Sequence, residues 1–402
     1  MTTLMRAPAR GTGAAPSRPI ISRALGISWV TVGWIPLLAG GALTLIGIAA
    51  IATTQPSLAT RQGIYAIVGV VLAAAMVVPL PSLIERWSVR VFGAMLVLLV
   101  LLVAPGVPDA IVRPRNGSRC WIDLGPIDMQ PAEFAKVAWI FASAWWLTRA
   151  ADVKSRLGIT LPLVLTAVPV VLILLQPDLG TALLFFPTLL AMLLAQGARR
   201  SHLIIVIVTA ALLAPASYPF LKPHQRARID SLVAQIIGDE RYTRTIGFQG
   251  DRARMLIGSG GVLGNGAERA AALVKFNALP EEHNDMIFVV ATCRWGLVGG
   301  LTIIALEAAI AFGAFLIAAS TRLPFGRLVG AGVGAMMGFQ ACVNIGMTMG
   351  LLPITGLTLP FVSSGGSSIV ASWIALGLLF SIAARDAKAG GLMGGSARRV
   401  AA

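Results

Sequence analysis

Charged residues are scarce in this chain, and acidic residues are the scarcest of them. Of 402 residues, 12% are charged and 56% are hydrophobic, and Asp and Glu together number 17. A soluble globular domain carries about 25% charged residues, and the mean hydropathy of +0.82 points the same way. The composition excludes an ordinary soluble domain and predicts a protein that crosses the membrane many times.

Cysteine and histidine are also rare, with three residues of each type. The cysteines are far apart in the chain, and their spacing fits neither a disulfide framework nor a metal site. The histidines lack the spacing of metal ligands as well, and neither a Ser-His-Asp set nor a His-Glu-x-x-His motif stands out. The sequence therefore offers no familiar hydrolase or metalloenzyme pattern.

The apolar runs are long and do not alternate with polar residues, which favours membrane helices over a closed barrel. A spanning helix needs roughly 20 apolar residues, so we predict an all-α fold, a polytopic membrane bundle of about ten transmembrane helices. The predicted spans lie near residues 28–52, 63–84, 91–112, 131–149, 158–176, 179–197, 202–220, 286–318, 327–351 and 366–384.

The basic residues predict the orientation of the bundle. The net charge of +15 is spread over short segments between spans, which is the pattern of the positive-inside rule and not that of a nucleic-acid-binding surface. We predict a cytoplasmic N-terminal segment at 1–27, a membrane domain at 28–385 and a cytoplasmic tail at 386–402. The tail is rich in Gly, Ala and Arg, and we expect it to be disordered.

Two segments on the predicted outer side are basic against this rule. The segment 113–130 holds three arginines, and the large extracytoplasmic loop 221–285 holds nine Lys and Arg residues. Long loops cross the membrane regardless of charge, so the predicted orientation stands. Both segments would face an anionic partner outside the cytoplasm or, with equal weight, lipid headgroups.

Asp285 lies in the stretch HNDMIFVV at 283–290, where the long polar loop meets an apolar span. Position alone favours a structural role in which Asn284 or Asp285 caps the next helix. The functional alternative is a base or ligand beside a substrate that is half lipid.

Glu133 and Lys136 are three residues apart in the helix expected after Pro131, so their side chains can pair on one face. A lysine inside a membrane span is costly, which indicates function. The alternative is an ion pair that only stabilises the bundle.

Three further segments have a structural and a functional interpretation. Asp178, at the break in LLQPDLG, either caps the following helix, which we favour, or contacts a substrate. The segment IGSGGVLGNG at 257–266 is either a glycine-rich turn, again favoured, or a phosphate cradle. The segment PFVSSGGSS at 360–368 either caps the last span, which is slightly favoured, or binds an anion at its N-terminus.

The order of these segments is more informative than any one of them. The motifs NGSRCWIDLG…QPAEFAK, QPDLGTAL, IGFQGDRARMLIGSGGVLGNG, LPEEHNDMIF and GLLPITGLTLPFVSSGGSS follow one another along the chain. Together they resemble the RodA/FtsW family of shape, elongation, division and sporulation glycosyltransferases. The resemblance extends from about residue 28 to residue 385, and the run MTMGLLPITG is more similar to RodA than to FtsW.

The resemblance implies an enzyme that polymerises lipid II into glycan strands at the outer face of the bacterial inner membrane. Its implied partner is a class B penicillin-binding protein, a transpeptidase that crosslinks the strands. The invariant aspartate of the family maps onto Asp285, which reverses the preference for a capping role. Asp285 would act as the catalytic base or would hold a divalent cation, the one cofactor that the resemblance leaves open.

Glycosyl transfer from a lipid pyrophosphate needs a base near the attacking hydroxyl and positive charge near the leaving group. The residues that the resemblance and this chemistry assign to substrate binding are Arg119, Trp121, Glu133, Lys136, Gln249, Ser363, Gly365 and Gly366.

The chain departs from the family pattern at a few positions. Cys293 and Arg294 stand where an acidic pair is usual, Ser364 replaces an aromatic residue and Cys120 replaces a frequent arginine. The first change keeps open a hypothesis in which the protein is a non-catalytic scaffold for the penicillin-binding protein. A lipid II flippase is the other alternative, although the clustering of polar residues on the outer side favours an enzyme.

Overall fold

The computed structural model describes residues 29–79, 81–108, 112, 118–125, 128–149, 156–216, 218–220, 223–237 and 248–399. Within these ranges, ten helices occupy the positions of the predicted spans: α2 (Trp29–Thr54), α3 (Pro56–Val77), α4 (Pro81–Val103), α5 (Pro131–Arg149), α6 (Arg156–Leu175), α7 (Leu179–Gln196), α8 (Arg200–Ala216), α13 (Ile287–Ser320), α14 (Pro324–Thr348) and α15 (Gly366–Arg399). The predicted all-α, polytopic membrane fold is confirmed.

Seven of the described helices are long and apolar enough to cross a membrane, namely α2, α3, α4, α7, α13, α14 and the part of α15 up to Arg385. The other three predicted spans correspond to α5, α6 and α8. Each of these three helices falls short of the seven in length or in hydropathy. They nevertheless pack among the seven: α5 contacts α4 and α14, and both α6 and α8 contact α7.

The predicted bounds of the second and third spans are wrong by several residues. Helix α3 begins at Pro56 and helix α4 begins at Pro81, because the fixed φ angle of proline suits the first turn of a helix. Arg61, expected in a loop, therefore lies in the first turns of α3. Arg86 and Arg90, expected in the next loop, lie within α4.

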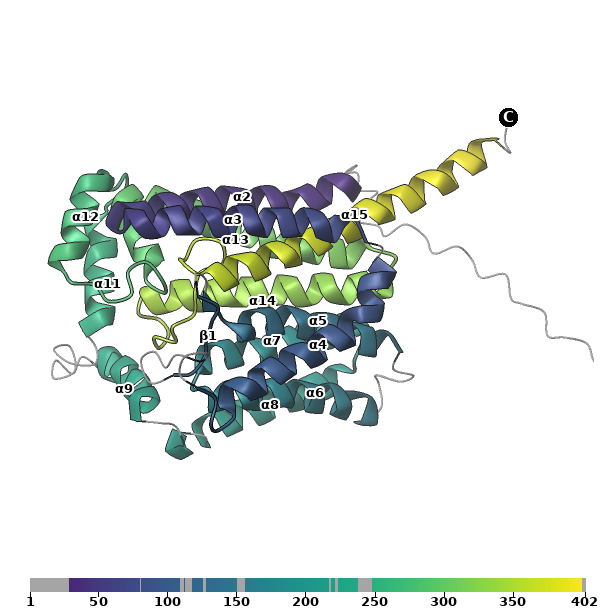
Figure 1. Cartoon of the computed structure of the whole chain (residues 1–402), viewed down its shortest axis with the longest axis horizontal. Helices are drawn as coiled ribbons and strands as arrows, with labels where there is room; N and C mark the ends of the chain where they lie inside the picture. The colour runs from purple at the N-terminus through teal and green to yellow at the C-terminus, as the bar shows by residue number, and fades with distance from the viewer. Residues whose placement is uncertain are drawn as a thin grey trace, which may run out of the picture.

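The two ends of the bundle can be told apart from side-chain contacts. At one end, Gln55 between α2 and α3 donates to Glu282 Oε1, 3.3 Å away. At the other end, Arg385 in α15 donates to the carbonyl oxygens of Val77 and Val78. The start of α2 and the end of α15 therefore share one end of the molecule, opposite the helices of the long loop (Figure 1).

The predicted outer loop 221–285 is largely helical where it is described. It contains α9 (Pro223–Ile237), α11 (Phe248–Ser259) and α12 (Gly266–Phe276), with a short 3-10 helix η1 (Tyr218–Phe220) before it. These helices form a cap over one end of the bundle (Figure 1). Residues 238–247 lie outside the described residues.

The glycine-rich segment 257–266 is a turn that packs against a kink in α13. Gly296 has φ 65° and ψ −159°, which breaks the regular helix there. The freed amides of Leu297 and Val298 donate to the carbonyl oxygens of Gly261 and Val262, at 2.9 and 3.2 Å. The structure thus supports the favoured interpretation of this segment as a turn. Its glycines allow its backbone to lie close to the backbone of α13.

Helix α5 is almost entirely enclosed by its neighbours. Trp139 is fully buried, and its ring lies 4.9 Å from that of Phe185 in α7. Most other side chains of α5 are buried as well, including those of Glu133 and Lys136. This burial keeps two charged groups inside the bundle.

Two features differ from the prediction. A small antiparallel pair, β1 (Ile122–Asp123) and β2 (Asp128–Met129), follows α4 and leads into α5. Helix α15 continues to Arg399, although we expected a disordered tail after Arg385.

The kink at Gly296 yields a prediction about stability. Its backbone conformation is one that only glycine adopts readily, with a cost of about 1–3 kcal/mol for another residue, and a Cβ there would lie 2.4 Å from the Val262 carbonyl oxygen. We expect Gly296→Ala to lower the unfolding temperature in detergent by several degrees.

The matched control is Gly258→Ala in α11, because a Cβ at that position meets nothing within 4 Å. Alanine is favoured over glycine in a helix by about 1 kcal/mol, so this variant should be as stable as the parent or more so. Equal stability of the two variants would contradict the packing described for the turn.

Candidate active site

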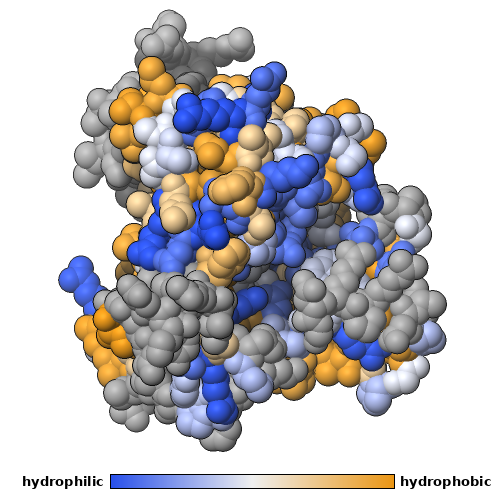
Figure 2. All heavy atoms as spheres, turned by 90° about the vertical axis from the view of Figure 1, so that its left-hand side faces the viewer, coloured by the Kyte–Doolittle hydropathy of each residue, from blue (hydrophilic) through white to orange (hydrophobic). Residues whose placement is uncertain are grey.

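A polar cavity of about 530 Å³ opens at the end of the bundle that the loop helices cover. Its walls come from α3, from the segment around β1 and β2, from the break between α6 and α7, from α9, and from the segments 281–285 and 355–368. Figure 2 shows this end of the molecule, where hydrophilic residues gather around a hollow. Segments that are far apart in the sequence thus meet at one site.

Asp285 lines this cavity with a carboxyl group that is almost completely buried. The residue is 4% exposed, and its Oδ1 atom has no hydrogen-bond partner among the described residues. Burial raises the pKa of Asp285 to about 7, with a further contribution from the nearby Glu281, while Arg228 opposes the rise. A carboxylate with a pKa near 7 is suited to take up a proton at neutral pH.

The capping role considered for Asn284 and Asp285 is wrong. The N-cap of α13 is Met286, and no described side chain caps this helix. The Asn284 side chain instead donates to Glu281 Oε2, 2.6 Å away. Asp285 therefore contributes to the cavity wall and does not cap α13.

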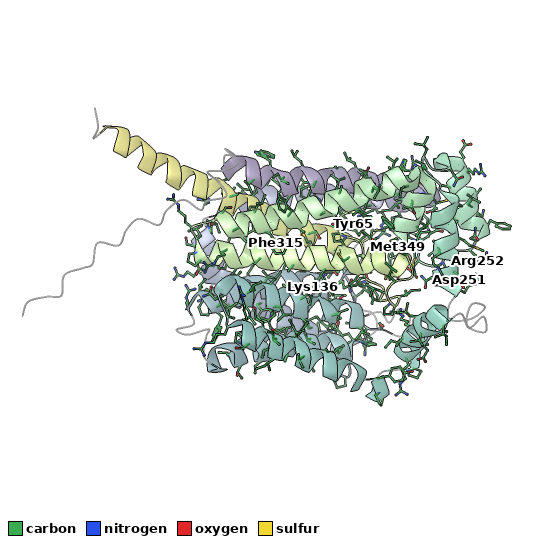
Figure 3. The ribbon with its side chains drawn as sticks, turned by 180° about the vertical axis from the view of Figure 1, so that it is seen from behind. Tyr65, Lys136, Asp251, Arg252, Phe315 and Met349 are labelled. Carbon is green, nitrogen blue, oxygen red and sulfur yellow. The ribbon has the colours of Figure 1, made fainter. Side chains whose placement is uncertain are left out.

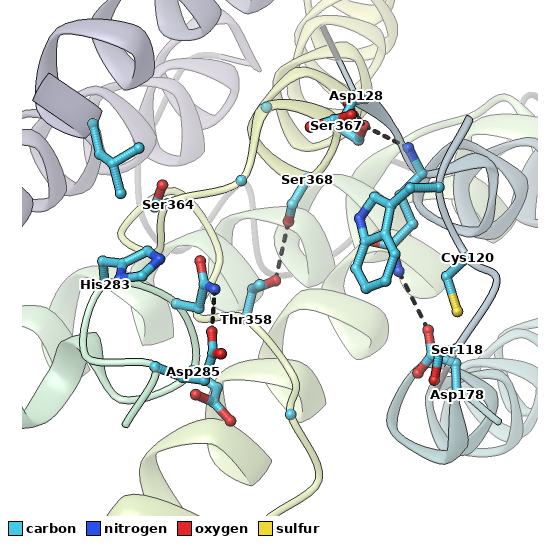
Figure 4. Close-up of a pocket in the computed structure, with 18 of the residues that line it drawn as sticks. Ser118, Cys120, Asp128, Asp178, His283, Asp285, Thr358, Ser364, Ser367 and Ser368 are labelled. Carbon is cyan, nitrogen blue, oxygen red and sulfur yellow. Dashed lines mark hydrogen bonds between the residues drawn. The ribbon is translucent and has the colours of Figure 1, made fainter. Parts of the chain in front are cut away.

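Asp178 forms the opposite wall of the cavity (Figure 4). It caps α7 as we favoured, since its Oδ1 accepts a hydrogen bond from the Thr181 amide at 3.0 Å. Its Oδ2 accepts a hydrogen bond from Gln130 Nε2 at 3.3 Å. Burial raises the pKa of Asp178. The residue thus combines the structural role with a position at the cavity wall.

Two arginines that the sequence analysis did not single out line the cavity, Arg61 from α3 and Arg228 from α9. Arg228 also donates to the Thr355 carbonyl oxygen, 3.1 Å away. Arg61 was missed because the span was placed too late in the chain. If α3 begins at Pro56, then Leu58, Gln62 and Tyr65 recur at helical spacing on one face, and Arg61 lies beside them. This spacing was the signal that could have placed Arg61 at the site.

Lys136 and Arg119, predicted to supply positive charge, do not line the cavity wall. Lys136 Nζ donates to Glu133 Oε1 at 3.0 Å and to Gln340 Oε1 at 3.2 Å. Figure 3 shows Lys136 among the helices of the bundle, away from the loop end. Arg119 donates to the Val107 carbonyl oxygen at 2.7 Å.

Lys136 reaches the cavity indirectly through a chain of hydrogen bonds. Gln340 donates to the Thr358 carbonyl oxygen at 2.9 Å, and the hydroxyls of Thr358 and Ser368 are 3.2 Å apart. Thr358 and Ser368 both line the cavity. A substrate contact of Glu133 or Lys136 stays a prediction, and their positions favour support of the wall.

The remaining predicted binding residues divide into two groups. Trp121, Gly365 and Gly366 line the cavity. A Cβ at Gly366 would lie 2.7 Å from the Tyr65 ring, so glycine allows the ring to lie this close. Gln249 and Ser363 lie outside the wall: Gln249 donates to the Pro280 carbonyl oxygen at 3.4 Å, and Ser363 donates to that of Asn284 at 2.7 Å.

Two further expectations concern charge and metal binding. Arg113 and Arg115, the other arginines of the basic segment, lie outside the described residues. Within the described ranges, three or more His, Cys, Asp or Glu side chains do not come together in one group. The hypothesis that Asp285 holds a divalent cation stays a prediction.

The buried pair of Glu133 and Lys136 yields a test by paired substitution. Lys136→Met alone leaves a buried carboxylate without its cation, which costs about 3–5 kcal/mol of stability. We expect the double variant Glu133→Gln, Lys136→Met to lose less, because neither charge is left alone. The free energy of unfolding in detergent, measured for the single and the double variant, tests this expectation.

The exposed pair of Arg149 and Glu85, 2.7 Å apart, provides the control. Arg149→Met should cost less than about 1 kcal/mol, as exposed ion pairs do. If the double variant at 133 and 136 were as unstable as Lys136→Met, the two charges would not be coupled.

Comparison with known proteins identifies the chain's relatives. The model of the FtsW, RodA and SpoVE family, described as cell cycle protein, matches residues 26–388. The probable peptidoglycan glycosyltransferase FtsW of Geobacter metallireducens is 33% identical over 365 residues, which cover 87% of this chain and 94% of that protein. The stage V sporulation protein E of Bacillus subtilis is 32% identical over 306 residues, which cover 74% and 81%.

Solved structures agree with these relatives. One solved structure is described as the structural coordination of polymerization and crosslinking by a peptidoglycan synthase complex. A chain of that structure superposes on this protein with a TM-score of 0.73 at 29% identity, and the match covers 88% of this chain and 98% of that one. The rod shape determining protein RodA of Thermus thermophilus superposes with a TM-score of 0.65 at 27% identity, covering 88% and 97%. The preference for RodA over FtsW stays a prediction. The chain belongs to the FtsW/RodA/SpoVE family.

Proposed function

We propose that this protein is a peptidoglycan glycosyltransferase that polymerises lipid II at the outer face of the bacterial cytoplasmic membrane. The observation that carries the proposal is the carboxyl group of Asp285, which is buried in a polar cavity at one end of a membrane bundle and has an oxygen without a partner among the described residues. The names of the relatives support this activity.

The reaction requires one proton transfer and one displacement. Asp285 accepts the proton of an attacking sugar hydroxyl while the hydroxyl oxygen bonds to the anomeric carbon of a second lipid-linked sugar. The bond between that carbon and the pyrophosphate oxygen breaks, and the lipid pyrophosphate leaves with the electron pair. The configuration at the anomeric carbon is inverted, and general-base catalysis of this kind contributes about 10²–10⁴-fold.

Arg61 and Arg228 are the cations best placed to stabilise the departing pyrophosphate. Both line the cavity that contains Asp285. Fixed positive charge at the leaving group stabilises the transition state more than the ground state, which is the condition for a faster reaction. This assignment replaces Lys136 and Arg119, whose groups bind within the protein.

The flippase alternative fits the structure less well, whereas the scaffold alternative stays a hypothesis that the polymerisation assay tests. A flippase needs a polar path across the membrane, but the polar cavity lies at one end of the bundle. The scaffold hypothesis rested on Cys293 and Arg294. The Arg294 side chain donates to the Ala49 carbonyl oxygen at 2.6 Å and to Thr53 Oγ1 at 2.8 Å, so it ties α13 to α2.

The proposal includes a partner and an orientation. A class B penicillin-binding protein would crosslink the strands that this chain makes, which is supported by the superposition on a chain of a peptidoglycan synthase complex. The loop helices α9, α11 and α12 would lie outside the cytoplasm, and both termini inside. The shared end of α2 and α15, opposite the loop helices, supports this arrangement (Figure 1).

Substitution of Asp285 tests the activity directly. We expect Asp285→Asn and Asp285→Ala to fold and to insert into membranes, but to lose polymerisation of labelled lipid II by at least about 100-fold, because the base is gone. Purified full-length protein, assayed with and without a transpeptidase partner, provides the measurement.

Glu282→Gln is the matched control. Glu282 is close to Asp285 in the chain but lies outside the cavity wall, and its Oε1 accepts a hydrogen bond from Gln55. Glutamine keeps that acceptor and removes the charge, so activity should persist. Normal glycan product from either Asp285 variant would exclude the catalytic role.

Thiol labelling tests the orientation. Leu263 in the α11–α12 turn and Val78 after α3 are each 80% exposed and lie at opposite ends of the bundle. Cys342 is the one exposed free cysteine among the described residues, so Cys342→Ser provides the background. In spheroplasts, Leu263→Cys should react with an impermeant maleimide, and Val78→Cys only after permeabilisation. The reverse pattern would invert the topology.

A further inference from the structure

We propose that Asn344 and Ser363 are positioning residues that, with the Ser364 amide, fix the backbone of residues 283–285 and thereby direct the Asp285 carboxyl group into the cavity. This inference rests on the proposed function, because it assigns a role within the same site. We call the three donor groups, Asn344 Nδ2, Ser363 Oγ and the Ser364 amide, the carbonyl clamp.

The clamp binds three successive carbonyl oxygens, one donor to each. The Ser364 amide donates to the His283 oxygen at 2.9 Å. Ser363 Oγ donates to the Asn284 oxygen at 2.7 Å, and Asn344 Nδ2 donates to the Asp285 oxygen at 2.9 Å. Ser364 and His283 lie close together in the cavity wall (Figure 4). Three consecutive peptide groups are therefore held by one set of donors.

The donors are themselves fixed, so the clamp is rigid. Ser363 Oγ accepts a hydrogen bond from the Leu359 amide at 2.7 Å. Asn344, which is completely buried, also donates to the Leu357 oxygen at 2.7 Å. One asparagine thus joins the loop before α15 to the segment that carries Asp285.

Gln62 in α3 holds the same loop through a second pair of bonds. Its Nε2 donates to the Ser363 oxygen at 2.9 Å, and its Oε1 accepts from the Gly365 amide at 3.1 Å. Gln62 is 1% exposed. These bonds bring the clamp, α3 and α14 into one network.

The carboxyl group of Asp285 is not held in this way. Its Oδ1 lacks a partner among the described residues, whereas its backbone oxygen is satisfied. Fixing the backbone limits the positions that the side chain can take, even though its own oxygen forms no bond to the described residues. The clamp therefore accounts for a reactive group that is both desolvated and available to a substrate.

Kinetics of two clamp variants test the proposal with purified full-length protein and labelled lipid II. Asn344→Leu removes two donated bonds with little change in volume and should lower kcat about 100-fold. Ser363→Ala removes one donated bond and should lower kcat about tenfold. KM should stay within about threefold, because the clamp orients the base and does not hold substrate.

The pH profile separates positioning from a loss of folded protein. In the parent, kcat should rise with pH through about 7 as Asp285 loses its proton. In the clamp variants Asp285 is no longer held in place and becomes better solvated, which lowers its pKa. The rising limb of the pH profile should therefore move to lower pH. The charged or titratable side chains that line the cavity with Asp285 are Arg61, Tyr65, Cys120, Asp128, Asp178, Arg228, Glu281 and His283, and they remain in every variant.

Thr348→Val in α14 is the control, since Thr348 is buried and its hydroxyl donates to Ile345 within its own helix. It should keep the kcat and the pH limb of the parent. Folded clamp variants with normal kcat, or with a lower kcat and an unmoved limb, would overturn the proposal. If Asn344→Leu does not fold, Ser363→Ala decides.

Failure of the proposed function and failure of the positioning role give different results. If the parent protein does not polymerise lipid II with or without a transpeptidase partner, the proposed function fails. If Asp285→Asn polymerises lipid II normally, the catalytic role of Asp285 fails, and the clamp has no catalytic group to position. If Asp285→Asn is inactive but both clamp variants behave as the parent, the positioning role alone fails.

Discussion

The site depends on one constraint, the burial of the Asp285 carboxyl group with an oxygen that has no hydrogen-bond partner among the described residues. Leaving a buried polar atom unsatisfied costs about 1–3 kcal/mol. The surrounding structure offsets this cost with hydrogen bonds from α14 and from the loop before α15 to the backbone that carries Asp285. The same burial raises the pKa of Asp285 to about 7. A local loss of stability thus accompanies a carboxyl group whose pKa suits the proposed role of a base at neutral pH.

The polar groups around the cavity form two layers with different tasks. Arg61, Arg228 and Asp178 line the cavity, where they can meet a ligand. Lys136 and Gln340 lie behind this wall and support Thr358 through hydrogen bonds. The presence of Cys293 and Arg294 in place of an acidic pair affects neither layer directly, because Arg294 binds α2 and lies 4.5 Å from the centre of the Trp295 ring.

Much of the fold could be predicted from the sequence, because long apolar runs have few alternatives in a membrane. The ten helices and the cap at Asp178 followed from residue type and order, whereas Asp285 was singled out by the family resemblance, since its position alone favoured a capping role. Helix starts at Pro56 and Pro81 were misplaced, since hydropathy changes gradually while a proline fixes a helix start at one residue. That error hid Arg61 and Gln62, although both lie in the wall of the site.

Contacts between distant segments could not be predicted in the same way. Nothing in local spacing joins Asn344 to Asp285, or Gln62 to Ser363, because packing of whole helices brings them together. Ser363 shows the limit: its motif was expected to cap the last span or, less favoured, to bind an anion, whereas its hydroxyl binds two backbone groups.

A structure of the full chain with a lipid-linked saccharide bound would test the role of Asp285 most directly. We predict that the attacking sugar hydroxyl lies within about 3 Å of Asp285 Oδ1, with the pyrophosphate of the second molecule against Arg61 and Arg228. A saccharide bound in the cavity with its hydroxyls away from Asp285, or a pyrophosphate bound far from both arginines, would contradict this role.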